Sequence, residues 1–207
     1  MQDNKIIIEA KKYVNSILVP LENLYYHQYE HALDVMTRAV YLGEKEWLND
    51  EEIEVLALAW LFHDTWFTIQ YENNEYIWAK IAQNYLKSKL YSLEKIEKIE
   101  KLILATDPNY DTPLNICEKI IKDSDLDNLG RDDFFLKWDK LKRELETIKK
   151  IKIKDPDWHH SSLDFLWSHS YFTKTQVNER GVKKKENEEI LKSMMKDDSE
   201  NVIKPNY

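Results

Sequence analysis

The sequence predicts an all-α protein, and three observations lead to this expectation. Leu, Ile, Lys and Glu dominate the 207 residues, and most of these residue types favour helices. The chain has only three Gly and five Pro, which is too few for the many turns of a β-sandwich or barrel. Hydrophobic residues make up 43% of the chain and seven Trp are present, so we expect a packed core although 33% of the residues are charged.

The first helices are predicted from their start and stop signals. One helix is expected over about residues 5–19, because Pro20 cannot continue it. A second is expected over about 24–42 and ends at Gly43, interpreted as a left-handed cap. Asp50 is expected to cap a third helix, since acidic side chains favour the positive end of the helix dipole.

Similar signals continue along the rest of the chain. Ser92 is expected to cap one helix, and Thr112 with Pro113 to start another that reaches toward Asp125. The other expected helices cover about residues 75–88, 132–150, 162–176 and 183–195, and the helix capped by Ser92 ends near 105. The polar segment 197–207 is expected to be a flexible tail. The sequence therefore predicts a single all-helical domain over residues 1–196.

Charge, cysteine content and hydropathy narrow the class of function. A net charge of −8 disfavours long nucleic acid as a ligand, because no basic stripe is present to replace its counterions. Cys117 is the only cysteine, which fits a reducing cytoplasm. The longest apolar stretch, residues 55–62, is far shorter than the ~20 residues that span a bilayer. We expect a cytoplasmic protein without a membrane segment or signal peptide.

His63 and Asp64 form the most informative feature of the chain, because they directly follow the apolar run 55–62. This run predicts a buried helix, and an imidazole and a carboxylate at its end are costly unless they are paired or bind a ligand. His31 lies upstream, and Asp125 lies downstream within an acidic cluster. Divalent ions bind neutral imidazole and carboxylate readily, so these residues outline a metal site.

His27 lies four residues before His31, so on a helix both side chains would share one face. A histidine taken alone is more often packed at an interface than bound to a metal, and this alternative stays open for each of them. The packing alternative is less favoured here, because three separate segments together supply one set of metal ligands. These ligands are His31, the pair His63-Asp64 and Asp125.

Three blocks of sequence resemble the HD superfamily of metal-dependent phosphohydrolases. They are residues 26–35 (YHQYEHALDV), 58–64 (LAWLFHD) and 123–130 (DSDLDNLG), in the order of the family. Residues 167–184 are similar to the end of small bacterial predicted phosphohydrolases of this group. The resemblance implies an all-helical bundle of the HD/phosphodiesterase-like type.

The resemblance also implies the metal ligands, which are His31, His63, Asp64 and Asp125. Relatives with two metals carry additional histidines between the HD pair and the last aspartate, but no histidine occurs here from residue 65 to 124. We therefore expect one divalent ion, which can be Mn, Mg, Co, Ni, Fe or Zn. The expected reaction is hydrolysis of a phosphate ester by metal-activated water.

Further roles are assigned to five side chains. Asp64 is expected to bind the ion and also orient the attacking water, and His27 or Glu75 to protonate the leaving group. The residues expected to bind substrate are His27, His169 and Arg180.

The substrate is expected to be small and phosphorylated, with a nucleotide as the first candidate. The sequence leaves open the choice between monoester and diester, and also the oligomeric state, including a homodimer. One alternative is a catalytically inactive HD-fold module that senses a nucleotide or a metal. Another is a structural helical bundle with incidental histidines.

The remaining conspicuous side chains are assigned to packing or to the surface. His159 and His160 are placed in a polar surface loop. Five tryptophans with apolar neighbours at helical spacing are expected in the core rather than in a binding site. They are Trp60, Trp66, Trp78, Trp138 and Trp167.

Overall fold

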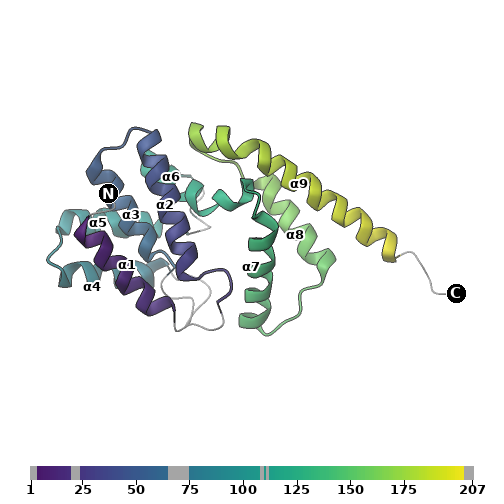
Figure 1. Ribbon diagram of the computed structural model, residues 1–207, viewed down its shortest axis with the longest axis horizontal. Coiled ribbons are helices and arrows are strands. Elements are labelled where there is room, and N and C mark those ends of the chain that lie inside the picture. Colours follow the sequence, from purple (N-terminus) through teal and green to yellow (C-terminus); the bar gives the residue numbers. More distant parts are fainter. Residues whose placement is uncertain (1–3, 20–23, 65–74, 108–109, 111, 203–207) are drawn as a thin grey trace. The chain divides into compact units, whose positions relative to one another are not determined.

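The structure is a computed structural model that describes residues 4–19, 24–64, 75–107, 110 and 112–202. Within these ranges the chain forms nine α-helices and one 3-10 turn, and no strand (Figure 1). The all-α prediction is confirmed. Internal contacts divide the chain into two compact units, Met1–Leu126 and Asp127–Tyr207. The single domain over residues 1–196 stays a prediction.

The first unit is built around one central helix. Its helices are α1 (Lys5–Leu18), α2 (Tyr29–Lys45), α3 (Asp50–Phe62), α4 (Glu75–Ser88), α5 (Leu93–Leu104) and α6 (Ile116–Asp125). Helix α3 packs against all five of the others. Ile53 and every residue from Val55 to Phe62 are buried. A helix that is apolar on all sides is stable only when other elements surround it, which explains the central position of α3.

Gly43 does not end α2, so the predicted left-handed cap at this residue is wrong. The helix continues to Lys45, and the residue with a positive φ is Trp47, at 64°. A Cβ atom at position 43 would lie 3.2 Å from Cγ1 of Ile53 on α3. Gly43 is therefore explained by the close approach of α2 to α3, and this packing could not be read from local turn signals.

Two predicted helix starts are shifted because asparagine side chains provide the caps. Asn49, rather than Asp50, caps α3 and forms a reciprocal capping box with Glu52. Asn115, rather than Thr112, caps α6 through a 3.0 Å hydrogen bond that its Oδ1 accepts from a backbone N–H. Asparagine is among the best N-cap residues, so these starts follow known preferences.

The second unit contains the turn η1 (Asp127–Gly130) and the helices α7 (Phe134–Lys149), α8 (Asp155–Ser168) and α9 (Lys174–Val202). Helix α9 packs on η1 and on α8. Helix α8 begins earlier than predicted, with Pro156 in its first turn, so His159 and His160 lie on a helix rather than in a loop. Helix α9 also includes residues 177–182 and 197–202, where we expected an interruption and a tail.

The tryptophans divide into core and surface residues. Trp60 and Trp78 are buried, as expected, and Trp138 is half-buried with its indole N–H donated to Ser162 Oγ at 2.6 Å. Trp167 was expected in the core but is 56% exposed. Its indole N–H instead donates to Glu188. Trp66 lies outside the described residues.

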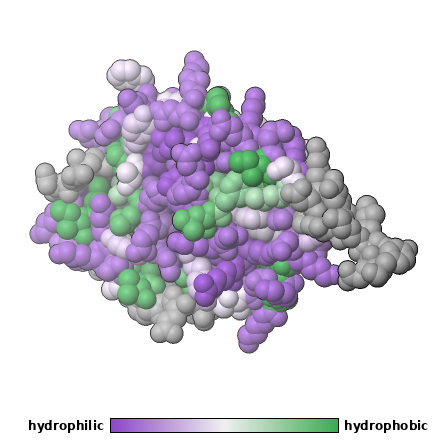
Figure 2. All heavy atoms as spheres, turned by 45° about the vertical axis from the view of Figure 1, so that its right-hand side comes forward, coloured by the Kyte–Doolittle hydropathy of each residue, from purple (hydrophilic) through white to green (hydrophobic). Residues whose placement is uncertain are grey.

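Hydrophilic side chains cover most of the molecular face in Figure 2, and hydrophobic ones form smaller groups between them. This distribution agrees with the 33% of charged residues in the chain. Among the described helices, none has both the length and the apolar character that crossing a membrane requires.

Candidate metal centre

Three helices of the first unit bring the four predicted ligands to one point. His31 lies on α2, His63 and Asp64 directly follow α3, and Asp125 is the last residue of α6. Helices α2 and α6 pack on each other and on α3. The cluster therefore forms where the central helix and α6 both end, beside the first turn of α2.

The candidate ligand atoms lie close to the separations expected around one bound ion. Nε2 of His63 is 2.8 Å from Oδ2 of Asp64, and Nε2 of His31 is 3.2 Å from the same oxygen. Both Nε2 atoms lie 3.7 Å from Oδ1 of Asp125. Ligands held about 2.0 to 2.2 Å from one ion are about 3.0 to 3.6 Å apart. Two imidazoles and two carboxylates form a donor set that suits several divalent transition metals.

Three of these polar atoms are buried and lack hydrogen bonds within the described part of the chain. They are Nε2 of His31, Nε2 of His63 and Oδ2 of Asp64. Most buried polar atoms in proteins have a hydrogen-bond partner, and leaving one unsatisfied is costly. A cation between the three atoms would satisfy all of them at once. The residues present therefore fit a divalent metal ion.

The second ring nitrogen of His63 fixes the orientation of the imidazole. Nδ1 lies 2.7 Å from the backbone carbonyl oxygen of Trp60, which accepts a hydrogen bond from a protonated Nδ1. A neutral His63 therefore carries the proton on Nδ1 and directs the lone pair of Nε2 toward the carboxylates. The Trp60 ring meets the imidazole edge-on, with 4.1 Å between the ring centroids.

Opposite charges dominate the electrostatics of the centre. Burial disfavours a protonated His63, but the charge of Asp64 and the contact with Asp125 outweigh it and raise the pKa of His63 to about 10. The pKa of His31 is also raised, against burial, by the same two carboxylates. Burial opposes the ionised form of Asp64 too, yet His63 and His31 lower its pKa. A binding cation would replace the imidazole protons.

His27 precedes helix α2 in the chain, and its ring lies close to the cluster. The predicted helical spacing of His27 and His31 is wrong, because α2 begins only at Tyr29 with Gln28 as its N-cap. The two imidazoles are nevertheless close, with edge-on rings whose centroids are 5.5 Å apart. Ligand atoms of His27, His31 and Asp64 all lie within 4.8 Å of one another. His27 is half-exposed, so it can contact both the centre and solvent.

Glu75 and Tyr26 are two further described residues near the cluster. Glu75 is the first residue of α4, and burial together with the charges of Asp107 and Asp64 raises the pKa of its carboxyl group. Tyr26 was missed by the sequence reasoning, although it stands beside His27 in the first block of the resemblance. Its ring centroid lies 4.7 Å from that of His31.

His169 and Arg180, the other predicted substrate-binding residues, belong to the second unit. His169 follows α8, and its ring lies edge-on to that of Tyr171, with centroids 4.7 Å apart. Arg180 lies on α9 and donates a 2.7 Å hydrogen bond from Nε to Oδ1 of Asp127. Substrate binding by either residue stays a prediction.

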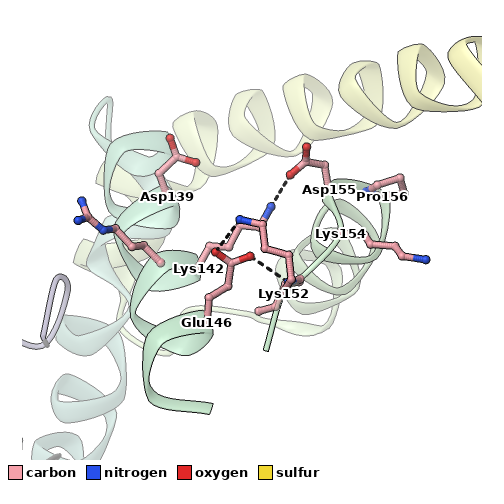
Figure 3. A pocket seen from close by; sticks show the side chains of 9 residues that line it. Asp139, Lys142, Glu146, Lys152, Lys154, Asp155 and Pro156 are labelled. Atoms are coloured by element: carbon pink, nitrogen blue, oxygen red, sulfur yellow. Dashed lines mark hydrogen bonds and ion pairs between the residues drawn. The ribbon is translucent and has the colours of Figure 1, made fainter. Parts of the chain in front are cut away.

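A pocket of about 850 Å³ lies within the second unit, between α7 and the start of α8 (Figure 3). It is lined by Asp139, Lys142, Arg143, Glu146, Lys152, Ile153, Lys154, Asp155 and Pro156. Lys142 pairs with Asp155, and Nζ of Lys152 lies 3.5 Å from Glu146. Several of its charges thus neutralise one another, and none of the predicted site residues lines this pocket.

Comparisons with solved structures identify the fold. The Lin1889 protein of Listeria innocua is 20% identical, with a TM-score of 0.65 over 92% of this chain and 93% of that one. Bacillus subtilis YpgQ, whose structure is a complex with ADP, is 16% identical, with a TM-score of 0.63 over 95% of this chain and 98% of that one. No protein-family model and no curated protein sequence matches this chain. The likeness therefore establishes a shared fold.

Proposed function

We propose that the protein is a metal-dependent phosphohydrolase of the HD type that acts on a small phosphate ester. The observation that carries this proposal is the buried triad of unsatisfied atoms on His31, His63 and Asp64, with Asp125 beside it. Without an ion these three buried atoms form no hydrogen bond with a described residue, and an unsatisfied buried polar atom lowers stability. The same donor set is what a hydrolytic metal centre needs.

The four candidate ligands differ in their exposure to solvent. The side chains of His31, His63 and Asp64 are 5%, 2% and 7% exposed, whereas that of Asp125 is 37% exposed. A substrate phosphate could therefore approach from the side of Asp125. When bound, the ion supplies a water of lowered pKa and neutralises charge on the phosphoryl oxygens.

The side chains around the centre can hold and move the required protons. Asp64 has a second carboxylate oxygen with which to orient a water molecule. Glu75 has a raised pKa, so it keeps a proton at higher pH than an ordinary glutamate and suits a general acid. His27 is half-exposed beside the cluster and is the alternative donor, or a contact for the substrate.

A nucleotide is the substrate class that we propose first. This choice is supported by the fold shared with YpgQ, a protein crystallised with ADP, and by the expectation from sequence. It is compatible with the acidic character of the chain, since a metal ion would mediate between carboxylates and a phosphate group.

The proposal is tested by adding Mn²⁺ to metal-free protein and measuring hydrolysis of an aryl phosphate monoester, an aryl phosphate diester and a panel of nucleotides. We expect hydrolysis of at least one substrate that requires the ion and stops when a chelator is added. Metal and nucleotide binding without turnover would favour the binding module instead. Failure to bind Mn²⁺ would contradict the phosphohydrolase, and failure to bind both Mn²⁺ and nucleotides would contradict the binding module as well.

A further inference from the structure

The turn η1 is held by three side chains of helix α9, all within the second unit. Gln176 donates to Oδ1 of Asp127 at 3.0 Å, and Arg180 donates to both oxygens of that carboxylate, at 2.7 and 3.3 Å. Asn187 donates to the backbone carbonyls of Leu129 and Arg131, at 2.9 and 3.0 Å. The turn is thus fixed both at its first residue and at its end.

Two further observations show how closely the turn and the helix fit. The side chain of Asp127 is only 6% exposed, and its charge is compensated by the guanidinium of Arg180 at 2.7 Å, the amide of Gln176 and the more distant guanidinium of Arg131 at 3.5 Å. A Cβ atom on Gly130 would lie 2.4 Å from the backbone oxygen of Arg180. Only glycine permits this approach, so the contact with α9 determines the position of the turn closely.

The clamped turn lies next to a metal ligand in the sequence. Helix α6 ends at Asp125 and η1 begins at Asp127, so Leu126 alone separates the ligand from the clamped carboxylate. Among the described residues, the ion-pair partners of Asp125 are the imidazoles of His31 and His63. Asp125 is the last residue of α6, and its backbone leads within two residues into η1, so a change at the turn can reach the carboxylate through the chain.

We infer that Arg180 is a positioning residue for the metal centre, acting through Asp127 on the backbone of Asp125. This inference rests on the proposed function, because it assumes that Asp125 binds a metal ion. Residues that orient metal ligands without touching the ion commonly change metal affinity by about 10- to 100-fold when they are replaced. The inference differs from the expectation that Arg180 contacts the substrate, and the two make different predictions.

The test compares Mn²⁺ affinity in three proteins by electron paramagnetic resonance, which needs no turnover. In Arg180→Met we expect the Kd for Mn²⁺ to rise about tenfold or more. Lys183→Met is the matched control, since it lies one turn further on α9 and pairs with Asp132, whose side chain is 95% exposed. Its Kd should equal that of the wild type.

A double variant separates positioning from loss of stability. Arg180→Met alone leaves the buried charge of Asp127 with Arg131, at 3.5 Å, as its remaining ion-pair partner. Asp127→Asn/Arg180→Met removes both members of the shorter pair and should regain thermal stability. Because the contact of Arg180 with the turn is still missing, the double variant should keep the weakened Mn²⁺ binding. Recovery of wild-type affinity together with stability would show a merely structural role and overturn the inference.

The remaining outcomes distinguish this inference from the proposed function. An unchanged Kd for Mn²⁺ in Arg180→Met, with a raised KM for substrate, would overturn the positioning role in favour of substrate binding. If the wild-type protein binds Mn²⁺ but hydrolyses no phosphate ester, the proposed function fails while the affinity comparison still decides the role of Arg180. If the wild type does not bind Mn²⁺, both fail.

Discussion

His31 and Asp64 meet across two helices, with Nε2 of the histidine 3.2 Å from Oδ2 of the aspartate. Both side chains are almost fully buried, and neither of these atoms forms a hydrogen bond with a described residue. Helix α2 supplies one and the end of α3 supplies the other, so the contact depends on the packing of these two helices. A shared cation is the simplest partner for both atoms.

Replacing Asp64 with alanine should abolish phosphatase activity, because this residue both binds the ion and orients its water. We expect a loss of about a hundredfold or more in kcat/KM, measured with Mn²⁺ in excess. His159→Ala is the control and should stay close to the parental rate, since His159 lies on α8 and stacks on Trp138. A folded Asp64→Ala protein with the parental rate would contradict the assignment.

The centre should bind one ion per chain. The sequence offers no histidine between residues 65 and 124, and the four main ligands share a single point. Metal analysis of protein dialysed after loading with Mn²⁺ should therefore give a ratio near one. A ratio of two would indicate that the neighbouring group of His27, His31 and Asp64 holds a second ion.

His169 should make the second unit sensitive to acid. Burial, together with the charge of Lys184, lowers the pKa of His169 to about 4, and neither ring nitrogen forms a hydrogen bond with a described residue. Because the folded pKa lies below the unfolded value of about 6.5, this contribution to stability is present above pH 6.5 and is lost as the pH falls toward 4.

Urea unfolding at pH 7 and pH 5 tests this prediction. Between pH 7 and pH 5 the free energy of unfolding should fall by up to about 2 kcal/mol more in the wild type than in His169→Phe. The phenylalanine keeps an aromatic ring but cannot be protonated. Comparing the two proteins cancels the other titrating groups. An equal loss of stability in both would show that His169 does not sense acid.

Substitution by alanine should change the free energy of unfolding in opposite directions at two glycines near Arg180. Gly130→Ala places a Cβ atom 2.4 Å from the backbone oxygen of Arg180 and should lower the free energy of unfolding by about 1 to 3 kcal/mol. Gly181→Ala meets no atom within 4 Å and lies inside α9, so it should raise that energy by about 0.5 to 1 kcal/mol. Urea unfolding of both variants measures the difference, and equal effects would refute the tight fit of η1 on α9.

The helices and the main cluster could be predicted because local patterns mark them. The apolar run 55–62 has the length and composition of a buried helix, and His63 with Asp64 stands at its end. Carboxylates and imidazoles at the ends of such helices are unusual enough to indicate a ligand. Thus His31 and the acidic cluster 123–127 could be grouped with this pair from residue type and order, whereas the choice of Asp125 within that cluster came from the resemblance to the HD superfamily.

Other features depend on contacts between distant residues and could not be predicted. Gly43 looks like a helix end, but its role is to let α2 approach Ile53. The carbonyl of Trp60 orients His63, and a backbone group leaves no signal in the sequence. Arg180 lies 53 residues from Asp127, so their pairing appears only in the folded chain.

The most direct measurement of the central claim is the anomalous X-ray scattering of crystals grown with Mn²⁺. The account predicts one strong peak per chain, in contact with His31, His63, Asp64 and Asp125, at ordinary metal–ligand distances of about 2.0 to 2.3 Å. A map in which this position holds no metal in Mn²⁺-saturated protein would contradict the account. A peak that leaves out His31 or Asp125 would contradict the assigned ligand set.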